Sequence, residues 1–487
     1  MHRLDFIIFS IAKLTMKHFL SFIFIILAAS GLQAQGHQDP YKSVVDRITI
    51  GYNSANYKSI YGMFSPQFRQ KISEAEFNTF MQNVSAYGKM ASVEYSHDKE
   101  GFKVYKATMD NAVLSLIISL NELLLIDGFA ITPYKAPLTG TPPDVLTTNN
   151  KATPLDLEVD KAVANFMDNP KNAGLSIAII KDAQTQIYHY GEAKKGSKRL
   201  PNNETIYEIG SITKTFTGIL LAKAVEDQKL SLYDDVRKFL PAKCSDLAFG
   251  NHPIILRHLA SHTAQLPRLP ENFDQQPYFD PLNPYKNYNT DMLYDYLSTL
   301  QIKSMPGVTQ DYSNLGMSLL GSIVAKAYDM DYDKLMKAYI AKPLKMNSTF
   351  VIVPDNKKDE FATGYYEGAE TPYWDWSDLP GAGGIKSTLD DMVLYLKANM
   401  DNAMPYIRFS HEPAFKKDNE ATGLGWFINK TDTGTSMHWH NGGTYGFSSF
   451  LGYIREKNCG IVLLANSFTS GDLDTMGTYL LKYLESQ

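Results

Sequence analysis

The stretch from Pro133 to Pro154 constrains this chain most, because neither a helix nor a strand can continue through it. It combines prolines and a glycine with a polar run, namely Pro137, Gly140, Pro142, Pro143 and Thr147 to Lys151. Proline removes a backbone donor, and clustered Thr and Asn favour turns, so the stretch predicts a linker over residues 133–154. This linker divides the 487-residue chain into a small module, 38–132, and a large domain, 155–487.

Residues 1–34 have the layout of a secretory signal peptide. An apolar run, Phe19 to Ala29, follows Lys17 and precedes small and polar residues that end at Ala34. The run is shorter than the roughly 20 residues that a membrane span needs. We expect cleavage after Ala34, a periplasmic or secreted protein and no stable membrane span after processing. A retained anchor is the alternative, because Phe6 to Leu14 adds apolar length, and Met16 is an alternative start.

Charge and cysteine content exclude several classes of protein. The formal charge is −5, and without residues 1–34 it is −7, from 44 Lys and Arg against 51 Asp and Glu. A mildly acidic chain lacks the basic surface that nucleic acids require. The two cysteines, Cys244 and Cys459, cannot form a disulfide framework, and the missing C-x-x-C argues against a thiolate zinc site.

The module 38–132 is expected to contain helices followed by strands. Ser73 and Glu76 form a capping-box pattern that opens a helix to Val84. The strand-like runs that follow are 89–95, 102–109, 112–118 and 123–131. The phrase from Met63 to Met90 resembles small cone-shaped NTF2-like α+β modules. A docking or spacer role is the simpler interpretation, and a pocket-bearing binding module is the alternative.

The domain 155–487 mixes both kinds of element. Strands are expected at both ends and helices between them, which indicates an α+β fold and not a doubly wound one. The expected strands are 175–180, 185–190, 436–439, 448–454 and 460–466, and the expected helices are 213–227, 317–328 and 472–484.

Ser211 and Lys214 are the first candidate catalytic pair. Residues three apart on a helix share a face. Gly210 precedes Ser211 and an amphipathic helix follows, so the serine is expected near unpaired N–H groups and the positive end of the helix dipole. Lys214 can accept a proton only when it is neutral, which requires burial or a nearby cation. A surface N-cap serine beside an ordinary lysine is the alternative.

The segment from Tyr312 to Asn314 is the second candidate. A phenol acts as a base only when ionised, which a neighbouring ammonium would promote by lowering its pKa. Asn314 offers an amide to a substrate. Tyr285 to Asn287 repeats the pattern in a loop rich in Pro, Tyr and Asn, and a core tyrosine is the simpler interpretation of Tyr312 alone.

The third candidate is the run from His438 to Gly443. On a strand His438 and His440 share a face, and the glycines allow a substrate backbone to approach closely. Two histidines in this spacing could bind a metal, but no third ligand is apparent in the sequence.

Together these motifs resemble the serine β-lactamase and penicillin-binding protein superfamily, specifically its class C-like branch. Further phrases are similar to this branch: 207–210, 256–263, 312–321 and 383–391. The resemblance covers residues from about 155 to the C-terminus. It implies an antiparallel sheet flanked by helices, with a helical subdomain.

The resemblance also implies roles for individual residues. Ser211 would be the acylated nucleophile, and Lys214 and Tyr312 would move its proton and later activate water. The N–H groups of Ser211 and Gly443 would form the oxyanion hole. Substrate-binding residues would be Asn314, His440, Asn441, Gly442 and Gly443.

Two departures from the branch concern specificity. His440 stands where β-lactamases usually have lysine, and a free histidine is only about a quarter protonated at pH 7. We therefore expect His440 to gain charge, and affinity for carboxylates, as the pH falls. A neutral hydrogen-bonding wall residue, fixed by His438, is the alternative. The segment Thr263 to Pro267 lacks the glycine that the branch usually has.

We expect a secreted serine hydrolase that acts through an acyl-enzyme, without metal or organic cofactor. Its partner would be a small-molecule or peptide substrate with an amide or ester bond: a D-amino-acid peptide, a simple ester or, less favoured, a β-lactam. Alternatives within the fold are an esterase, a D-aminopeptidase or a non-catalytic penicillin-binding-like sensor. A structural envelope protein is a further alternative.

Overall fold

The computed structural model describes residues 40–99, 101–134, 145–417, 420–469 and 471–487, which form two compact units. Residues 145–153, which the sequence predicts as linker, belong to the second unit, where Thr147 pairs with Tyr190. The expected signal peptide lies outside these residues. Among the described residues, no helix is long and apolar enough to cross a membrane.

The first unit, 40–134, is a meander sheet packed on helices. Its strands pair in the order β1-β2-β3-β4, all antiparallel. Ser73 and Glu76 form the predicted capping box at the start of α4. The elements are α1 (Pro40–Asn53), α2 (Tyr57–Tyr61), α3 (Pro66–Arg69), α4 (Glu74–Ser85), β1 (Met90–Lys99), β2 (Phe102–Met109), β3 (Val113–Leu120) and β4 (Ile126–Pro133).

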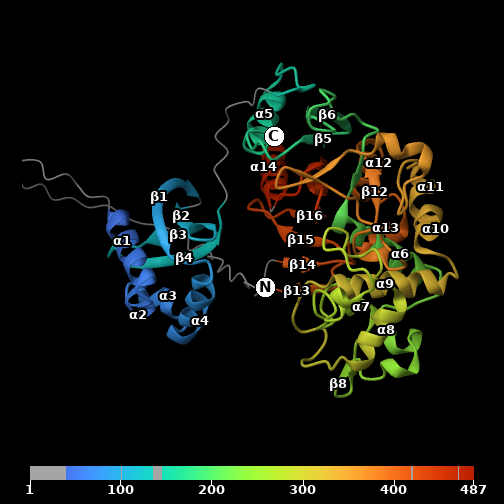
Figure 1. The fold of residues 1–487 in the computed structure, drawn as a ribbon, viewed down its shortest axis with the longest axis horizontal. Coiled ribbons are helices and arrows are strands. Elements are labelled where there is room, and N and C mark those ends of the chain that lie inside the picture. Colours follow the sequence, from blue (N-terminus) through green and yellow to red (C-terminus); the bar gives the residue numbers. More distant parts are fainter. Residues whose placement is uncertain (1–39, 100, 135–144, 418–419, 470) are drawn as a thin grey trace, which may run out of the picture. The chain divides into compact units, whose positions relative to one another are not determined.

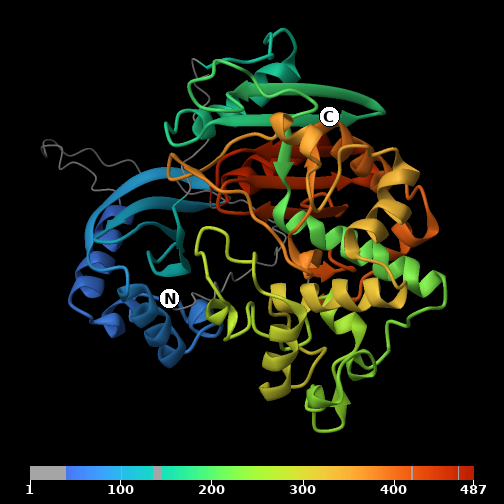
Figure 2. The same ribbon diagram turned by 45° about the vertical axis from the view of Figure 1, so that its right-hand side comes forward.

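The second unit is built on an eight-stranded antiparallel sheet with the order β13-β14-β15-β16-β17-β18-β5-β6. Strand β5, at the start of the unit, pairs with β18 near its end, so the two ends of the domain share one sheet. Figure 2 shows the green β5–β6 hairpin beside the red strands of this sheet. The strands are β5 (Gly174–Lys181), β6 (Gln184–Gly191), β13 (Phe415–Lys417), β14 (Glu420–Thr422), β15 (Phe427–Lys430), β16 (Ser436–Gly443), β17 (Ser448–Ile454) and β18 (Cys459–Ala465).

Helices cover both faces of the sheet (Figure 1). Helices α5 and α14 pack on one face, and α12 packs on the other, where α6, α9 and α13 also cluster. The helices are α5 (Pro154–Met167), α6 (Thr213–Glu226), α7 (Leu256–Ala260), α8 (Thr290–Thr299), α9 (Asn314–Ala327), α10 (Tyr332–Met336), α11 (Lys342–Leu344), α12 (Leu389–Met400), α13 (Pro405–Ser410) and α14 (Asp472–Ser486).

Short strands complete the second unit. Of these, β7 (Ile206–Glu208) pairs with β12 (Lys386–Thr388) directly before the nucleophile segment. The others are β8 (Ala248–Phe249), β9 (His252–Pro253), β10 (Gly364–Tyr366) and β11 (Ala369–Thr371).

Local sequence explains the boundaries that matter for the site. The β5–β6 hairpin turns at Asp182 and Ala183, both with positive φ, as a two-residue turn requires. Helix α9 begins at Asn314 because the Ser313 hydroxyl accepts the Gly316 N–H, three residues earlier than the apolar pattern alone predicts. Helix α6 is buried on nearly all sides, from Thr213 to Ala222 and at Ala224, so it lies inside the domain and is not the amphipathic helix that the sequence predicts.

Candidate active site

The candidate nucleophile lies in a tight turn between β7 and α6. Gly210 has φ +48°, and Ser211 follows in a single-turn 3₁₀ helix, Gly210–Ile212, that leads into α6. Strand β16 runs against this turn. A Cβ on Gly442 would lie 2.1 Å from the Ile209 carbonyl oxygen, so only glycine permits this contact.

Lys214 is buried beside the serine. Its side chain is fully buried, and Nζ lies 2.8 Å from Ser211 Oγ and 2.6 Å from the carbonyl oxygen of Ala382. Burial lowers the pKa of Lys214 well below its ordinary value, and the Arg268 cation lowers it further. This shift raises the neutral fraction of the amine above that of a free lysine, and the neutral amine is the state that can accept a proton from the serine hydroxyl.

Tyr312 completes the group around Ser211. The Lys214 Nζ lies 4.8 Å from the centre of its ring. Burial raises the pKa of Tyr312, and this exceeds the opposing effects of a hydrogen bond with Ser211 and the charge of Arg268. The sequence-based expectation of a lowered phenol pKa is wrong for the unliganded protein. Desolvation outweighs the charge of Arg268, and Lys214 is not among the groups that lower the pKa of Tyr312.

Asn314 lies at the first turn of α9, directly after the Tyr312 segment. Its Nδ2 donates to the Tyr285 hydroxyl at 3.0 Å. Its Oδ1 is buried and has no hydrogen-bond partner within the described residues. A buried amide oxygen in this state is costly, so it is suited to accept an N–H from a bound substrate.

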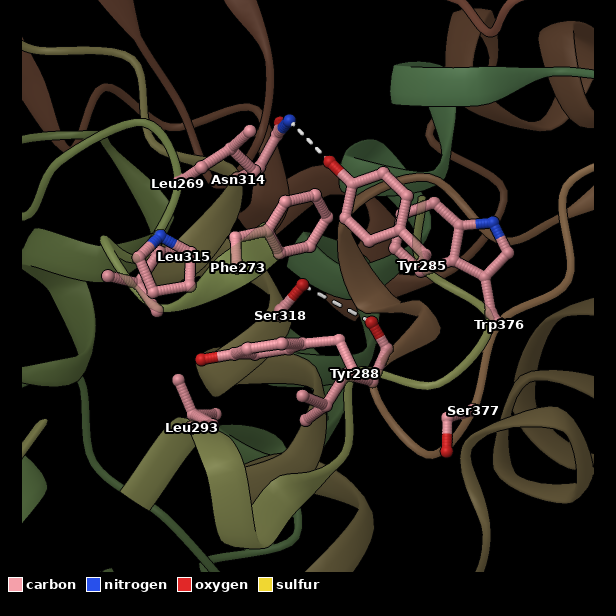
Figure 3. A pocket seen from close by; sticks show the side chains of 12 residues that line it. Leu269, Phe273, Tyr285, Tyr288, Leu293, Asn314, Leu315, Ser318, Trp376 and Ser377 are labelled. Atoms are coloured by element: carbon pink, nitrogen blue, oxygen red, sulfur yellow. Dashed lines mark hydrogen bonds between the residues drawn. The ribbon is translucent and has the colours of Figure 1, made fainter. Parts of the chain in front are cut away.

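An apolar pocket opens beside Asn314 (Figure 3). The rings of Phe273, Tyr285, Tyr288 and Trp376 surround it, and Tyr285 stacks on Trp376 with 3.9 Å between ring centres. None of its lining side chains is charged. The other lining residues are Leu269, Pro270, Leu293, Asn314, Leu315, Ser318, Ser377 and Leu379.

His440 lies on β16 with its ring near that of Tyr312, 6.3 Å between centres. The residue is 1% exposed, and its Nδ1 donates to the carbonyl oxygen of Asn441 at 2.6 Å. Burial, with a contribution from Lys214, lowers the pKa of His440 to about 3. The expected gain of charge between pH 8 and pH 6 is therefore wrong for the unliganded protein.

Asn441 lies on the same strand with its side chain on the opposite face from His440. Its Nδ2 donates to Asp474 on α14 at 2.8 Å. The structure thus directs the Asn441 side chain to Asp474 and away from the face that carries His440, which disagrees with its expected role as a substrate-binding side chain. Gly442 and Gly443 do lie against the nucleophile turn, where Gly443 N is 2.6 Å from the Cβ position of Gly210.

His438 has a packing role on β16. Its ring stacks on Tyr453 with 5.1 Å between centres. The part of the chain that the structure describes holds no group of three or more His, Cys, Asp or Glu side chains arranged to bind a metal.

Three residues of the site were not singled out from the sequence: Arg268, Tyr285 and Ala382. Arg268 follows the Thr263–Pro267 segment directly, and its guanidinium lies 5.0 Å from the centre of the Tyr312 ring. Tyr285 had been set aside as part of a chance repeat of the Tyr312 pattern. The sequence carries no local signal for Ala382, which contributes only its carbonyl.

Known proteins are similar to this chain in sequence and in fold. The sequence profile of the Beta-lactamase family matches residues 159–485. A β-lactamase of Pseudomonas fluorescens is 29% identical over 352 residues, which cover 65% of this chain and 94% of that protein. The D-alanyl-D-alanine-carboxypeptidase/endopeptidase AmpH of Escherichia coli (strain K12) is 27% identical over 322 residues, which cover 62% of this chain and 81% of that protein.

A solved structure agrees with these sequence matches. The crystal structure of a β-lactamase/D-alanine carboxypeptidase from Pseudomonas syringae has a TM-score of 0.59 and 26% identity, and the match covers 68% of this chain and 99% of that one. The resemblance stated from the motifs is confirmed. Because the family match spans most of the second unit and includes Ser211, Lys214 and Tyr312, the chain belongs to the Beta-lactamase family of serine hydrolases.

Proposed function

We propose that Ser211 attacks the carbonyl carbon of an amide or ester substrate and carries the acyl group as a covalent intermediate. The observation that carries this proposal is the fully buried Lys214, whose Nζ lies 2.8 Å from Ser211 Oγ. A lysine with a lowered pKa is an adequate base for a serine hydroxyl, which is a weak nucleophile by itself.

The pKa directions divide the proton transfers between two residues. Lys214, as the neutral amine, takes the proton from Ser211 as the Oγ–C bond forms. Tyr312, as a neutral phenol hydrogen-bonded to Ser211, gives its proton to the leaving nitrogen or oxygen as the scissile bond breaks. The Lys214 ammonium then returns a proton to Tyr312. Water repeats the sequence in deacylation, with Ser211 as the leaving group.

The oxyanion would be held by two backbone N–H groups, those of Ser211 and Gly443. The close packing of β16 against the turn at Gly210 brings these two segments together. Preorganised N–H donors stabilise the negative charge that develops on the carbonyl oxygen, and loss of one such donor costs roughly 10²- to 10³-fold in kcat.

We propose peptides or simple esters as substrates and place β-lactams second. Relatives carry the names β-lactamase and D-alanyl-D-alanine-carboxypeptidase/endopeptidase. His440 is neutral where a lysine is usual in β-lactamases. Asn314, with an unpartnered Oδ1 among the described residues, would bind the amide of the acyl half of a substrate, and the pocket beside it would hold an apolar side chain.

Two further proposals concern the N-terminal part. We propose export through the signal peptide 1–34. For the module 38–132 we propose a docking or spacer role, because the rings of Phe64, Phe77 and Phe129 pack edge to face or tilted within its core. Deletion of this module should leave kcat on a small ester unchanged, and a large loss would contradict the spacer role.

Steady-state hydrolysis tests the proposed function. The mature protein is incubated with three substrates: an activated ester, a peptide ending in D-alanyl-D-alanine and a chromogenic cephalosporin. We expect repeated turnover of the ester or the peptide, abolished in Ser211→Ala, while the variant retains its circular dichroism spectrum and melting temperature.

The control separates an enzyme from a sensor. A sensor would acylate once and release product in a single burst equal to the amount of protein. Hydrolysis that continues unchanged in Ser211→Ala would refute the nucleophile, and a burst without turnover on every substrate would refute an enzyme in favour of a sensor.

A further inference from the structure

Arg268 is an exposed cation at the edge of the active site. Its guanidinium lies over the Tyr312 ring, with 5.0 Å from Cζ to the ring centre. Its positive charge also contributes a lowering of the pKa at Lys214, His262 and Tyr285, so its field extends to the groups around Ser211. Within the described residues, no carboxylate lies within ion-pair distance of Arg268. A guanidinium is thus held over the Tyr312 ring with no anionic partner among the residues that the structure describes.

The backbone of Arg268 is fixed by the helix that carries Asn314. Its carbonyl oxygen accepts the N–H groups of Asn314 at 3.0 Å and Leu315 at 3.2 Å. These are N–H groups of the first turn of α9, which have no partner inside the helix. Arg268 is therefore attached to the same rigid element as Asn314, and only its side chain is free to adjust to a ligand.

The next residues along the chain line the apolar pocket. Leu269 and Pro270 belong to its wall together with Asn314. A ligand that places an apolar group in this pocket and an amide on Asn314 therefore passes beside the Arg268 guanidinium.

We propose that Arg268 binds a carboxylate of the substrate and so makes the enzyme selective for anionic amides or esters. This inference rests on the proposed acyl transfer by Ser211 and adds the charge of the substrate. The chain lacks a lysine at position 440, and the buried, neutral His440 offers no cation there. A guanidinium supplies what an imidazole of this kind cannot: a permanent charge and paired N–H donors that match the two oxygens of a carboxylate.

A matched pair of substrates tests the proposal. The two are phenyl esters of N-(3-carboxybenzoyl)glycine and of N-(3-carbamoylbenzoyl)glycine, called here the benzoate ester and the benzamide ester, which carry the charged or neutral group on the acyl half and differ little in shape. We expect Arg268→Ala to lower kcat/KM on the benzoate ester about 10- to 100-fold, the effect of losing one charge-assisted hydrogen bond. The loss on the benzamide ester should be at least ten times smaller. Compared with Arg268→Ala, Arg268→Lys should restore part of the selectivity for the benzoate ester, since lysine keeps the positive charge but lacks the paired N–H donors of the guanidinium.

The control is Arg408→Ala, which removes an exposed arginine from α13. This variant should leave kcat/KM unchanged on both substrates. Salt provides a second readout, because selectivity for the benzoate ester should fall with ionic strength in the wild type and not in Arg268→Ala.

Two results would overturn the proposal. Equal losses on both esters, with the acid limb of the pH–rate profile moved to higher pH, would mean that Arg268 acts through the pKa of Lys214. No loss on either ester would mean that Arg268 has no role in binding. Neither result affects the acyl-enzyme proposal, which fails only if hydrolysis of the benzamide ester persists in Ser211→Ala.

Discussion

Gly442→Ala is expected to damage catalysis without destroying the fold. The added Cβ would lie 2.1 Å from the Ile209 carbonyl oxygen and 2.4 Å from Ser449 Oγ, whereas real Cβ contacts are not shorter than 3.0 Å. The Ser449 hydroxyl can rotate, but Ile209 O belongs to the backbone two residues before Ser211. Strand β16 and the nucleophile turn must therefore separate by about 0.9 Å, the difference between 3.0 and 2.1 Å.

The expected magnitude follows from this displacement. A misplacement of about 1 Å in a catalytic array can cost about 10²-fold in rate. The same overpacking should lower the free energy of unfolding by about 1–3 kcal/mol. We expect kcat on an activated ester to fall about 100-fold, with KM changed much less, because the oxyanion site moves relative to Ser211.

A matched glycine variant provides the control. Gly316→Ala, in the first turn of α9, adds a Cβ whose nearest contact is 3.4 Å away, an ordinary van der Waals distance. It should retain kcat within about twofold, since a methyl group fits there without backbone movement. Stopped-flow acylation and denaturant unfolding are measured on both variants. A kcat for Gly442→Ala within threefold of the wild type would refute the argument that this contact sets the geometry of the site.

Further predictions concern the proton transfers, the pocket and the mature N-terminus. Lys214→Met and Tyr312→Phe should each lower kcat by about 10²- to 10⁴-fold and the double variant little more, as measured by steady-state kinetics; additive losses would contradict a shared proton path. For the wild type, kcat/KM should rise with pH through the lowered pKa of Lys214, because only the neutral amine accepts a proton, and a rate that falls with pH there would exclude the lysine base. Between pH 6 and 8 an anionic and a neutral ester should show parallel profiles, since His440, with a pKa of about 3, stays neutral, and diverging profiles would show that it titrates. Ser318→Leu should fill the pocket and lower kcat/KM for a branched acyl ester about 10-fold relative to acetate; an unchanged ratio would place the acyl group elsewhere. Intact-mass analysis of the exported protein should give Gln35 as the first residue, and a retained apolar run would indicate an anchor.

Local sequence signals predicted much of the fold. The strands expected at 175–180 and 185–190 and the capping box at Ser73 depend on residues within a few positions of each other, and they are present. Strands β13 to β15 were not predicted, because they are only three or four residues long, although each pairs with the next strand along the chain. The strands β5 and β18 were expected, but their pairing was not predicted, because it joins the two ends of the domain.

At the candidate active site, the sequence predicted the relative position of two residues but not the environment of others. The spacing of Ser211 and Lys214 predicted a shared helix face, and the structure brings them to 2.8 Å. The alternation of side chains along β16 already implied that Asn441 faces away from His440, and this signal was not used. The neutrality of His440 could not be predicted, because it depends on burial by chain segments far away in the sequence.

Covalent labelling of the nucleophile tests the central claim most directly. The mature protein is treated with a fluorophosphonate probe, and the adduct is located by intact-mass and peptide mass spectrometry. We expect one adduct per chain, on Ser211, with none in Ser211→Ala and much slower labelling in Lys214→Met. An adduct on another residue, or undiminished labelling of Ser211→Ala, would contradict the assignment of Ser211 as the nucleophile.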